Sequence, residues 1–148
     1  MMYDYMTPGV VNEINNLPLP ELQSTIVDTF HNQRQEQYDL LNNSGRDELL
    51  HDCLVKMNYM LTSIIGTMEG SFDPETDNPQ EYYESMGHKG ETILQIMGDE
   101  KVTNLHQLLL NRLCDTEDLQ ACIDICTNFL IHSTCSFINR FIQEDNNG

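Results

Sequence analysis

The segment 117–143 constrains the fold more than any other part of the chain. It contains neither glycine nor proline, and its apolar residues cover more than one stripe of a helix. Those residues are Leu119, Cys122, Ile123, Ile125, Cys126, Phe129, Leu130, Ile131, Cys135, Phe137, Ile138, Phe141 and Ile142. A helix that is apolar around most of its circumference is usually the buried centre of a bundle. We therefore predict a long, largely buried C-terminal helix.

Two earlier segments also show helical spacing. In 46–68 the apolar residues repeat at intervals of three and four, with Ser44 as the expected N-cap and Gly70 as the expected terminator. In 20–43 a stripe of apolar residues begins after Pro20, a residue that suits the first position of a helix. We predict one helix over each segment.

Shorter helices are predicted between these long ones. Asn78 and Pro79 resemble the start of a helix that continues to Met86, a second covers 90–97, and Thr103 is expected to cap a third that ends near Leu113. No segment alternates as a strand does. The prediction is an all-α fold, a compact bundle of about five to seven helices. Residues 1–17 form a lead-in segment with one helical turn at most, and residues 18–148 form a single helical domain with an acidic loop at 69–84.

The charge balance limits the classes of partner. The chain has 7 Lys and Arg against 24 Asp and Glu, a formal charge of -17, and its basic residues are scattered singly. Binding to nucleic acid, or to an anionic membrane surface, requires clustered basic residues. We therefore expect no direct contact with nucleic acid or membrane, and a protein partner with a basic surface.

The N-terminal residues have no basic region followed by an apolar one, and we expect no apolar run to be long enough to cross a bilayer. These features predict a cytoplasmic protein, or one in the host-cell cytosol if the source is a virus. The five cysteines are an odd number without the spacing of a disulfide scaffold, so they are expected to be reduced core thiols.

The loop at 69–84 is the strongest candidate for a functional surface, because it concentrates acidic residues without any Lys or Arg. The candidate partner-binding residues are Glu69, Asp73, Glu75, Asp77, Glu81 and Glu84. Asp73, Glu75, Asp77 and Glu84 also have the spacing of positions 1, 3, 5 and 12 of a Ca²⁺-binding EF-hand loop, with Glu81 at position 9. Position 6 is Asn78 where such loops have glycine, and position 7 is Pro79. A solvated acidic loop is the preferred interpretation, and the metal site is a weak candidate.

Other chemistry has less support in the sequence. Cysteine and histidine gather in the last third, but no C-x₂-C pair occurs, so structural cysteines are favoured over a zinc site. No nucleophile elbow, phosphate-binding glycine loop or dinucleotide fingerprint is present. We predict no catalytic residues and no cofactor. A methionine-rich stripe that includes Met57, Met60 and Met68 fits either a core or an exposed groove.

The favoured function is therefore a non-enzymatic protein–protein interaction module, an inhibitor or regulator. A sharper version holds that the acids imitate the charge of nucleic acid and block a basic nucleic-acid-binding protein. Small acidic helical proteins of phages and other viruses act in this way, and the chain resembles them in character though not in any motif. The alternatives are a carboxylate-metal-dependent all-α hydrolase, for which Glu81 and Glu84 supply one E-x-x-E spacing, and a self-associating structural subunit.

Overall fold

The computed structural model describes residues 3–70, 73, 75–78, 81 and 99–147. Within these residues the chain forms helices and no strands, which confirms the predicted all-α bundle. The helices are α1 (Pro8–Asn15), α2 (Pro20–Asn32), α3 (Arg34–Ser44), α4 (Arg46–Glu69), α7 (Asp99–Cys114) and α8 (Leu119–Asn147). The helices predicted over 78–86 and 90–97 lie mostly or wholly outside the described residues.

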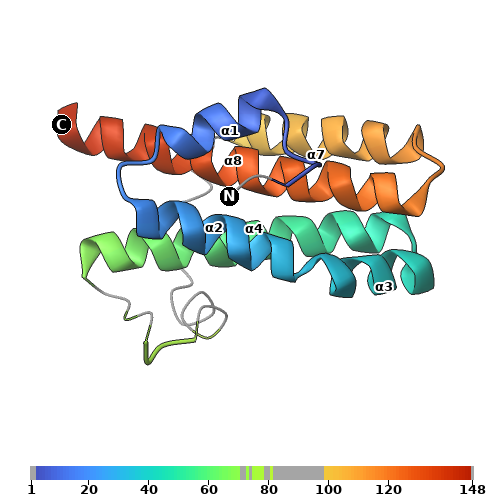
Figure 1. Cartoon of the computed structure of the whole chain (residues 1–148), viewed down its shortest axis with the longest axis horizontal. Helices are drawn as coiled ribbons and strands as arrows, with labels where there is room; N and C mark the ends of the chain where they lie inside the picture. Colours follow the sequence, from blue (N-terminus) through green and yellow to red (C-terminus); the bar gives the residue numbers. More distant parts are fainter. Residues whose placement is uncertain (1–2, 71–72, 74, 79–80, 82–98, 148) are drawn as a thin grey trace.

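Helix α8 is the centre of the bundle, as its apolar pattern predicted. The other five described helices all pack against it, and Figure 1 shows it running the length of the molecule among them. The side chains of Cys126, Leu130 and Ile131 have no exposed surface. Because α8 removes apolar surface from water on several sides at once, it contributes more to the core than a helix with a single apolar stripe.

Helix α8 also bears on the expectation that no apolar run could cross a bilayer. The part from Leu119 to Gln143 is long and apolar enough to do so by length and composition, with a mean hydropathy of 1.3. The expectation was therefore wrong by this measure. In the folded protein 61% of that apolar window is buried against the other helices, which is also how the core helix of a bundle behaves.

The lead-in segment is more ordered than a single turn. Pro8 occupies the start of α1, the hydroxyl of Thr7 accepts a hydrogen bond from the amide of Val10 at 3.5 Å, and Val10 and Ile14 are buried. The side chain of Asn139 in α8 donates a hydrogen bond to the backbone carbonyl of Glu13 at 3.1 Å. The segment therefore packs against the same core as the rest of the chain.

The helix predicted over 20–43 is two helices, so this prediction was wrong. Gln33 lies between α2 and α3 with φ -83° and ψ -7°, and it both ends the first helix and begins the second. The apolar stripe continues across the break, because Phe30 and Leu41 are eleven residues apart, close to three helical turns. Both residues face the core, and their spacing alone therefore does not reveal the break.

Two predicted N-caps were also wrong. Ser44 is the last residue of α3, and Gly45 precedes α4 with a φ of 94°, a conformation that residues with a Cβ rarely adopt. Thr103 lies inside α7, which begins four residues earlier. The predicted end of α4 is confirmed, because Gly70 has the left-handed conformation of a C-terminal cap, with φ 79°.

Candidate functional site

The described part of the acidic loop is exposed and held by its own hydrogen bonds. The exposed acids are Asp73, Glu75, Asp77 and Glu81. A carboxylate oxygen of Asp73 accepts the amide of Glu75 at 3.0 Å, and one of Asp77 accepts the amide of Asp73 at 2.9 Å. These side chain to backbone bonds shape the turn and still leave most of each carboxylate in water. Figure 1 shows the described residues of this loop away from the helices.

The loop continues beyond these residues in both directions. The side chain oxygen of Asn78 accepts the amide of Glu81 at 3.1 Å, which is the hydrogen bond expected of an N-cap and supports that part of the prediction. Glu69 is the last residue of α4, but its side chain lies outside the described residues, as does all of Glu84. The structure therefore describes the side chains of four of the six candidate residues.

The position of the loop adds to its negative potential. It follows the C-terminal end of α4, where the unpaired carbonyls give the helix dipole its negative end. The sequence from Glu69 to Glu84 contains no basic residue. No cation within the segment therefore offsets the negative charge of the loop carboxylates. The end of the helix that they follow does not offset this charge either, because it is itself negative.

A second group of acids, which we call the acidic end, lies where the α3–α4 and α7–α8 turns meet. It consists of the exposed residues Asp47, Glu48, Asp115, Glu117 and Asp118. Arg46 joins the two turns, because its guanidinium donates to the carbonyls of Leu113 at 2.8 Å and Thr116 at 2.7 Å. The sequence did not reveal this surface, because its two halves are far apart along the chain.

The acidic end has a simpler structural explanation than the loop. Asp47 and Glu48 lie in the first turn of α4. A carboxylate oxygen of Asp118 accepts the amide of Gln120 at 3.1 Å and so caps α8. Acids at helix N-termini complement the positive end of the dipole. Part of the charge at this end is therefore offset by the two helices that begin there.

Replacing Arg46 by methionine tests the connection between the two turns. Methionine keeps much of the apolar stem but removes the donors that satisfy two carbonyls, and hydrogen bonds from a charged group contribute about 1.5–3 kcal/mol each. We expect the free energy of unfolding to fall by about 2 kcal/mol, since the site is half-buried. Urea unfolding measures the change. The control is Arg112→Met on the exposed surface of α7, for which a loss of equal size would contradict the role of Arg46.

A third polar cluster, absent from the sequence-based predictions, joins the N-terminal segment to the bundle. The guanidinium of Arg34 forms an ion pair with Asp124, donates to the hydroxyl of Thr127 at 2.8 Å, and lies 4.2 Å from the centre of the Tyr5 ring. The Tyr5 hydroxyl is 2.7 Å from Nδ1 of His31. Burial raises the pKa of Tyr5 to about 12, so this hydroxyl keeps its proton at neutral pH.

The metal-site predictions receive no support from the described residues. Among them, no three His, Cys, Asp or Glu side chains lie close enough to hold a metal ion. Because Glu84 is outside the described residues, the EF-hand interpretation of the loop stays a prediction.

The cysteines behave as structural residues. All five are free, and four are buried, whereas Cys114 is exposed at the end of α7 in contrast to the expected core position. A hydrogen bond with Cys126, together with burial, raises the pKa of Cys53 well above its usual value. A thiol with a raised pKa is a poor nucleophile and a poor metal ligand at neutral pH.

The methionine-rich stripe is mainly core. Met57 and Met60 are buried, whereas Met68 is 42% exposed near the end of α4. A methionine-lined groove of the kind that accepts a partner helix would need several of these side chains at the surface. In the described part of the chain, the stripe therefore does not supply such a groove.

Comparison with known proteins adds no functional information, because no protein-family model, no curated protein and no solved structure matches the chain.

Proposed function

We propose that the protein is a non-enzymatic interaction module that binds a basic protein surface through its acidic loop, as an inhibitor or regulator. The observation that supports the proposal is the exposure of its charge. Every acidic side chain that the structure describes is exposed, apart from the half-buried Glu13, Asp52 and Asp124. A surface of this kind attracts a basic partner over distances of about one Debye length, roughly 8 Å at physiological ionic strength.

The arrangement of two arginines strengthens the argument. Arg34 is engaged with Asp124 and the Tyr5 ring, and Arg46 with backbone carbonyls, so both guanidinium groups act within the fold. Neither guanidinium group offsets the negative charge of the loop carboxylates. In the part of the chain that the structure describes, the acidic charge therefore lies mainly at the surface, where it is available to a partner.

The loop is a better candidate contact than the acidic end, because helix N-termini offset part of the charge at the acidic end. A finer version of the proposal is that the acids take the place of phosphates in the channel of a nucleic-acid-binding protein. A cytoplasmic location, in the host cell if the source is a virus, would suit this role. The hydrolase and the self-associating subunit remain alternatives, and no observation on the described residues favours either.

Two matched variants test the proposal. In the first, four loop acids are neutralised by Asp73→Asn, Glu75→Gln, Asp77→Asn and Glu81→Gln. The amides keep an acceptor oxygen at Asp73 and Asp77, so the hydrogen bonds of the turn can still form. In the second, the same charge is removed from the acidic end by Asp47→Asn, Glu48→Gln, Asp115→Asn and Glu117→Gln, while the capping residue Asp118 is kept.

The measurement is affinity capture from the native host, followed by titration of the identified partner with both variants. At a few tenths of a kcal/mol per exposed charge, loss of four charges is expected to weaken binding by about ten-fold for the loop variant. The variant of the acidic end is expected to weaken binding of the partner less. Affinity should fall steeply with salt, and for the mimicry version DNA should compete. Binding that is insensitive to salt, or equal weakening by both variants, would contradict the loop as the contact.

Titration with Ca²⁺, Mg²⁺ and Mn²⁺ separates this proposal from the metal-dependent alternatives. Heat released on saturable binding at low millimolar metal, lost in the loop variant, would favour the Ca²⁺ loop or the hydrolase. Light scattering after size-exclusion chromatography addresses the third alternative, because a stable oligomer would favour the self-associating subunit.

A further inference from the structure

An apolar corner lies on the surface between α1 and α2. It consists of the exposed residues Pro18, Leu19 and Pro20, and the Leu19 side chain is 53% exposed. The side-chain amide of Gln23 donates a hydrogen bond to the carbonyl of Leu17 at 3.2 Å, and Leu17 itself is buried. Each proline also fixes one backbone dihedral angle. The apolar corner is therefore restrained, and a partner that binds it has little additional chain to order.

The apolar corner and the acidic loop lie at the same end of the bundle. Figure 1 shows α2 beginning, and α4 ending, at this end. Both helices pack against α8, and the axes of packed helices are about 8–10 Å apart, so the axes of α2 and α4 are separated by about 20 Å at most. A standard protein interface covers about 800 Å² of each partner, roughly 30 Å across. One partner can therefore contact the corner and the loop together.

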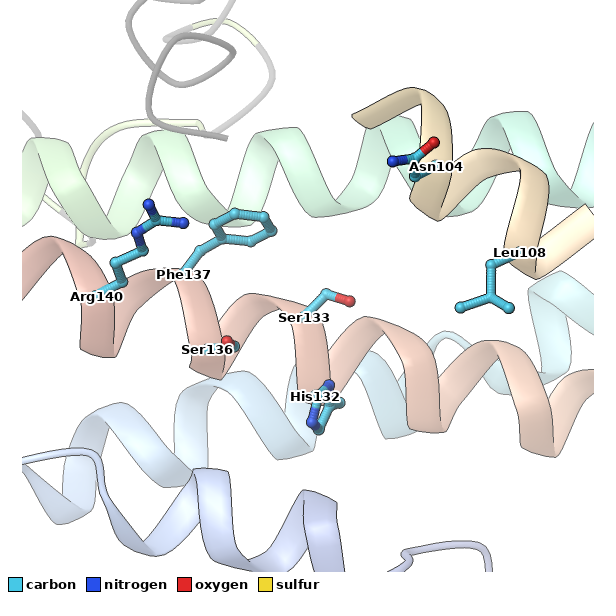
Figure 2. Close-up of a pocket in the computed structure, with 7 residues that line it drawn as sticks. All are labelled: Asn104, Leu108, His132, Ser133, Ser136, Phe137 and Arg140. Carbon is cyan, nitrogen blue, oxygen red and sulfur yellow. The ribbon is translucent and has the colours of Figure 1, made fainter. Parts of the chain in front are cut away.

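Exposed apolar side chains are more frequent at this end than elsewhere in the described residues. Three large apolar side chains are exposed there and on the rest of the described surface, namely Leu19, Met68 and Leu108. Leu19 precedes α2, and Met68 lies in the last turn of α4, next to the acidic loop. Leu108 lies nearer the acidic end, where α7 ends, and Figure 2 shows it lining a pocket between α7 and α8. Exposed apolar residues that are scattered singly need no explanation, but two of these three lie beside the acidic loop.

We infer that the basic partner presents large apolar side chains among its lysines or arginines, and that these pack against Leu19 and Met68. The inference rests on the proposed function, because the basic residues of the same partner contact the acidic loop. Attraction between the charges is screened by salt, whereas the apolar contact is not an interaction between charges. The apolar contact also gives selectivity, because a basic surface without apolar side chains gains only the charge interactions.

Two synthetic peptides of equal length and charge test the inference. The apolar peptide has the order Lys-Lys-Leu-Lys-Phe-Lys-Lys, and in the polar peptide serine replaces leucine and phenylalanine. We expect the apolar peptide to bind roughly five-fold more tightly at physiological salt, the gain for covering about half of a leucine side chain. Amide resonances around Leu19 and Met68 should shift and saturate on titration. Equal affinity of the wild type for the two peptides would overturn the inference.

Variants of the exposed apolar residues locate the contact. Leu19→Gln combined with Met68→Gln should remove the advantage of the apolar peptide. Binding of the polar peptide should be unchanged, which also shows that the variant is folded. Leu108→Gln is the matched control, because Leu108 is 47% exposed, and it should keep the advantage. An advantage that the double variant keeps, or that the control loses, would overturn the inference.

The loop variant separates this inference from the proposed function. Neutralising Asp73, Glu75, Asp77 and Glu81 should weaken binding of both peptides by the same factor and leave the ratio of their affinities unchanged. This weakening, together with equal affinity of the wild type for the two peptides, would overturn the apolar contact alone. If the loop variant binds both peptides as tightly as the wild type does, the proposed function is contradicted, and the inference with it.

Discussion

Replacing Leu130 by alanine is expected to lower the free energy of unfolding by about 2–5 kcal/mol, the range for large-to-small substitutions in a packed core. Leu130 has no exposed surface and lies in the middle of α8, where helices from several sides meet. The cavity cannot be closed by moving one neighbour, because each neighbouring helix is held by its own contacts with α8. The expected loss is therefore in the upper part of that range.

Urea unfolding followed by circular dichroism measures this loss. Leu19→Ala is the control, because Leu19 is 53% exposed before α2 and its side chain makes no capping hydrogen bond. We expect the control to change stability by about 0.5 kcal/mol or less, as for most surface substitutions. A loss for Leu130→Ala no larger than that of the control would mean that α8 is not the centre of the core.

The long apolar patterns made the main features of the fold predictable. In the segment 46–68, the predicted core positions Leu50, Cys53 and Met57 are all buried in α4. Helix α8 follows from the same reasoning, because a helix with so many apolar positions must be covered on several sides. Burial of apolar side chains is the dominant favourable term in folding, and its periodicity can be read from the sequence.

Helix ends were predicted less well, because they depend on local backbone geometry. Ser44 and Gly45 are both acceptable caps by residue type, and the positive φ of Gly45 decides between them. The break at Gln33 replaces no apolar residue and leaves the stripe intact. Neither feature alters the hydrophobic pattern, so a pattern-based prediction does not detect it.

The polar connections between helices were not predictable, because their partners are far apart in the sequence. Arg34 pairs with Asp124, and Arg46 reaches Leu113 and Thr116, in both cases across the bundle. An isolated arginine in an acidic chain gives no indication of which acid or carbonyl it will meet. The acidic loop, by contrast, was visible in the sequence, since its charge density and prolines need no knowledge of the fold.

The stability of the protein should depend strongly on alkaline pH, through Cys135. Burial, with a smaller contribution from the charge of Glu13, raises the pKa of this thiol from 9.0 to about 12. The unfolded chain therefore loses the thiol proton at a lower pH than the folded protein does. Below about pH 9 both states keep the proton and the full stability is present. Between about pH 9 and 12 the unfolded state binds fewer protons, so stability falls as the pH rises.

The expected slope from this one group is about 1.4 kcal/mol for each pH unit once the unfolded thiol is ionised, so roughly 2 kcal/mol is lost between pH 9 and 11. Urea unfolding at several pH values measures the slope for the wild type and for Cys135→Ala. The alanine variant starts from a lower stability because of the small cavity, but its curve should be flatter by the contribution of the thiol. Cys114→Ala, at the exposed cysteine, should keep the wild-type slope. Parallel curves for the wild type and Cys135→Ala would show that the Cys135 thiol ionises as readily in the folded protein as in the unfolded chain, in spite of its burial.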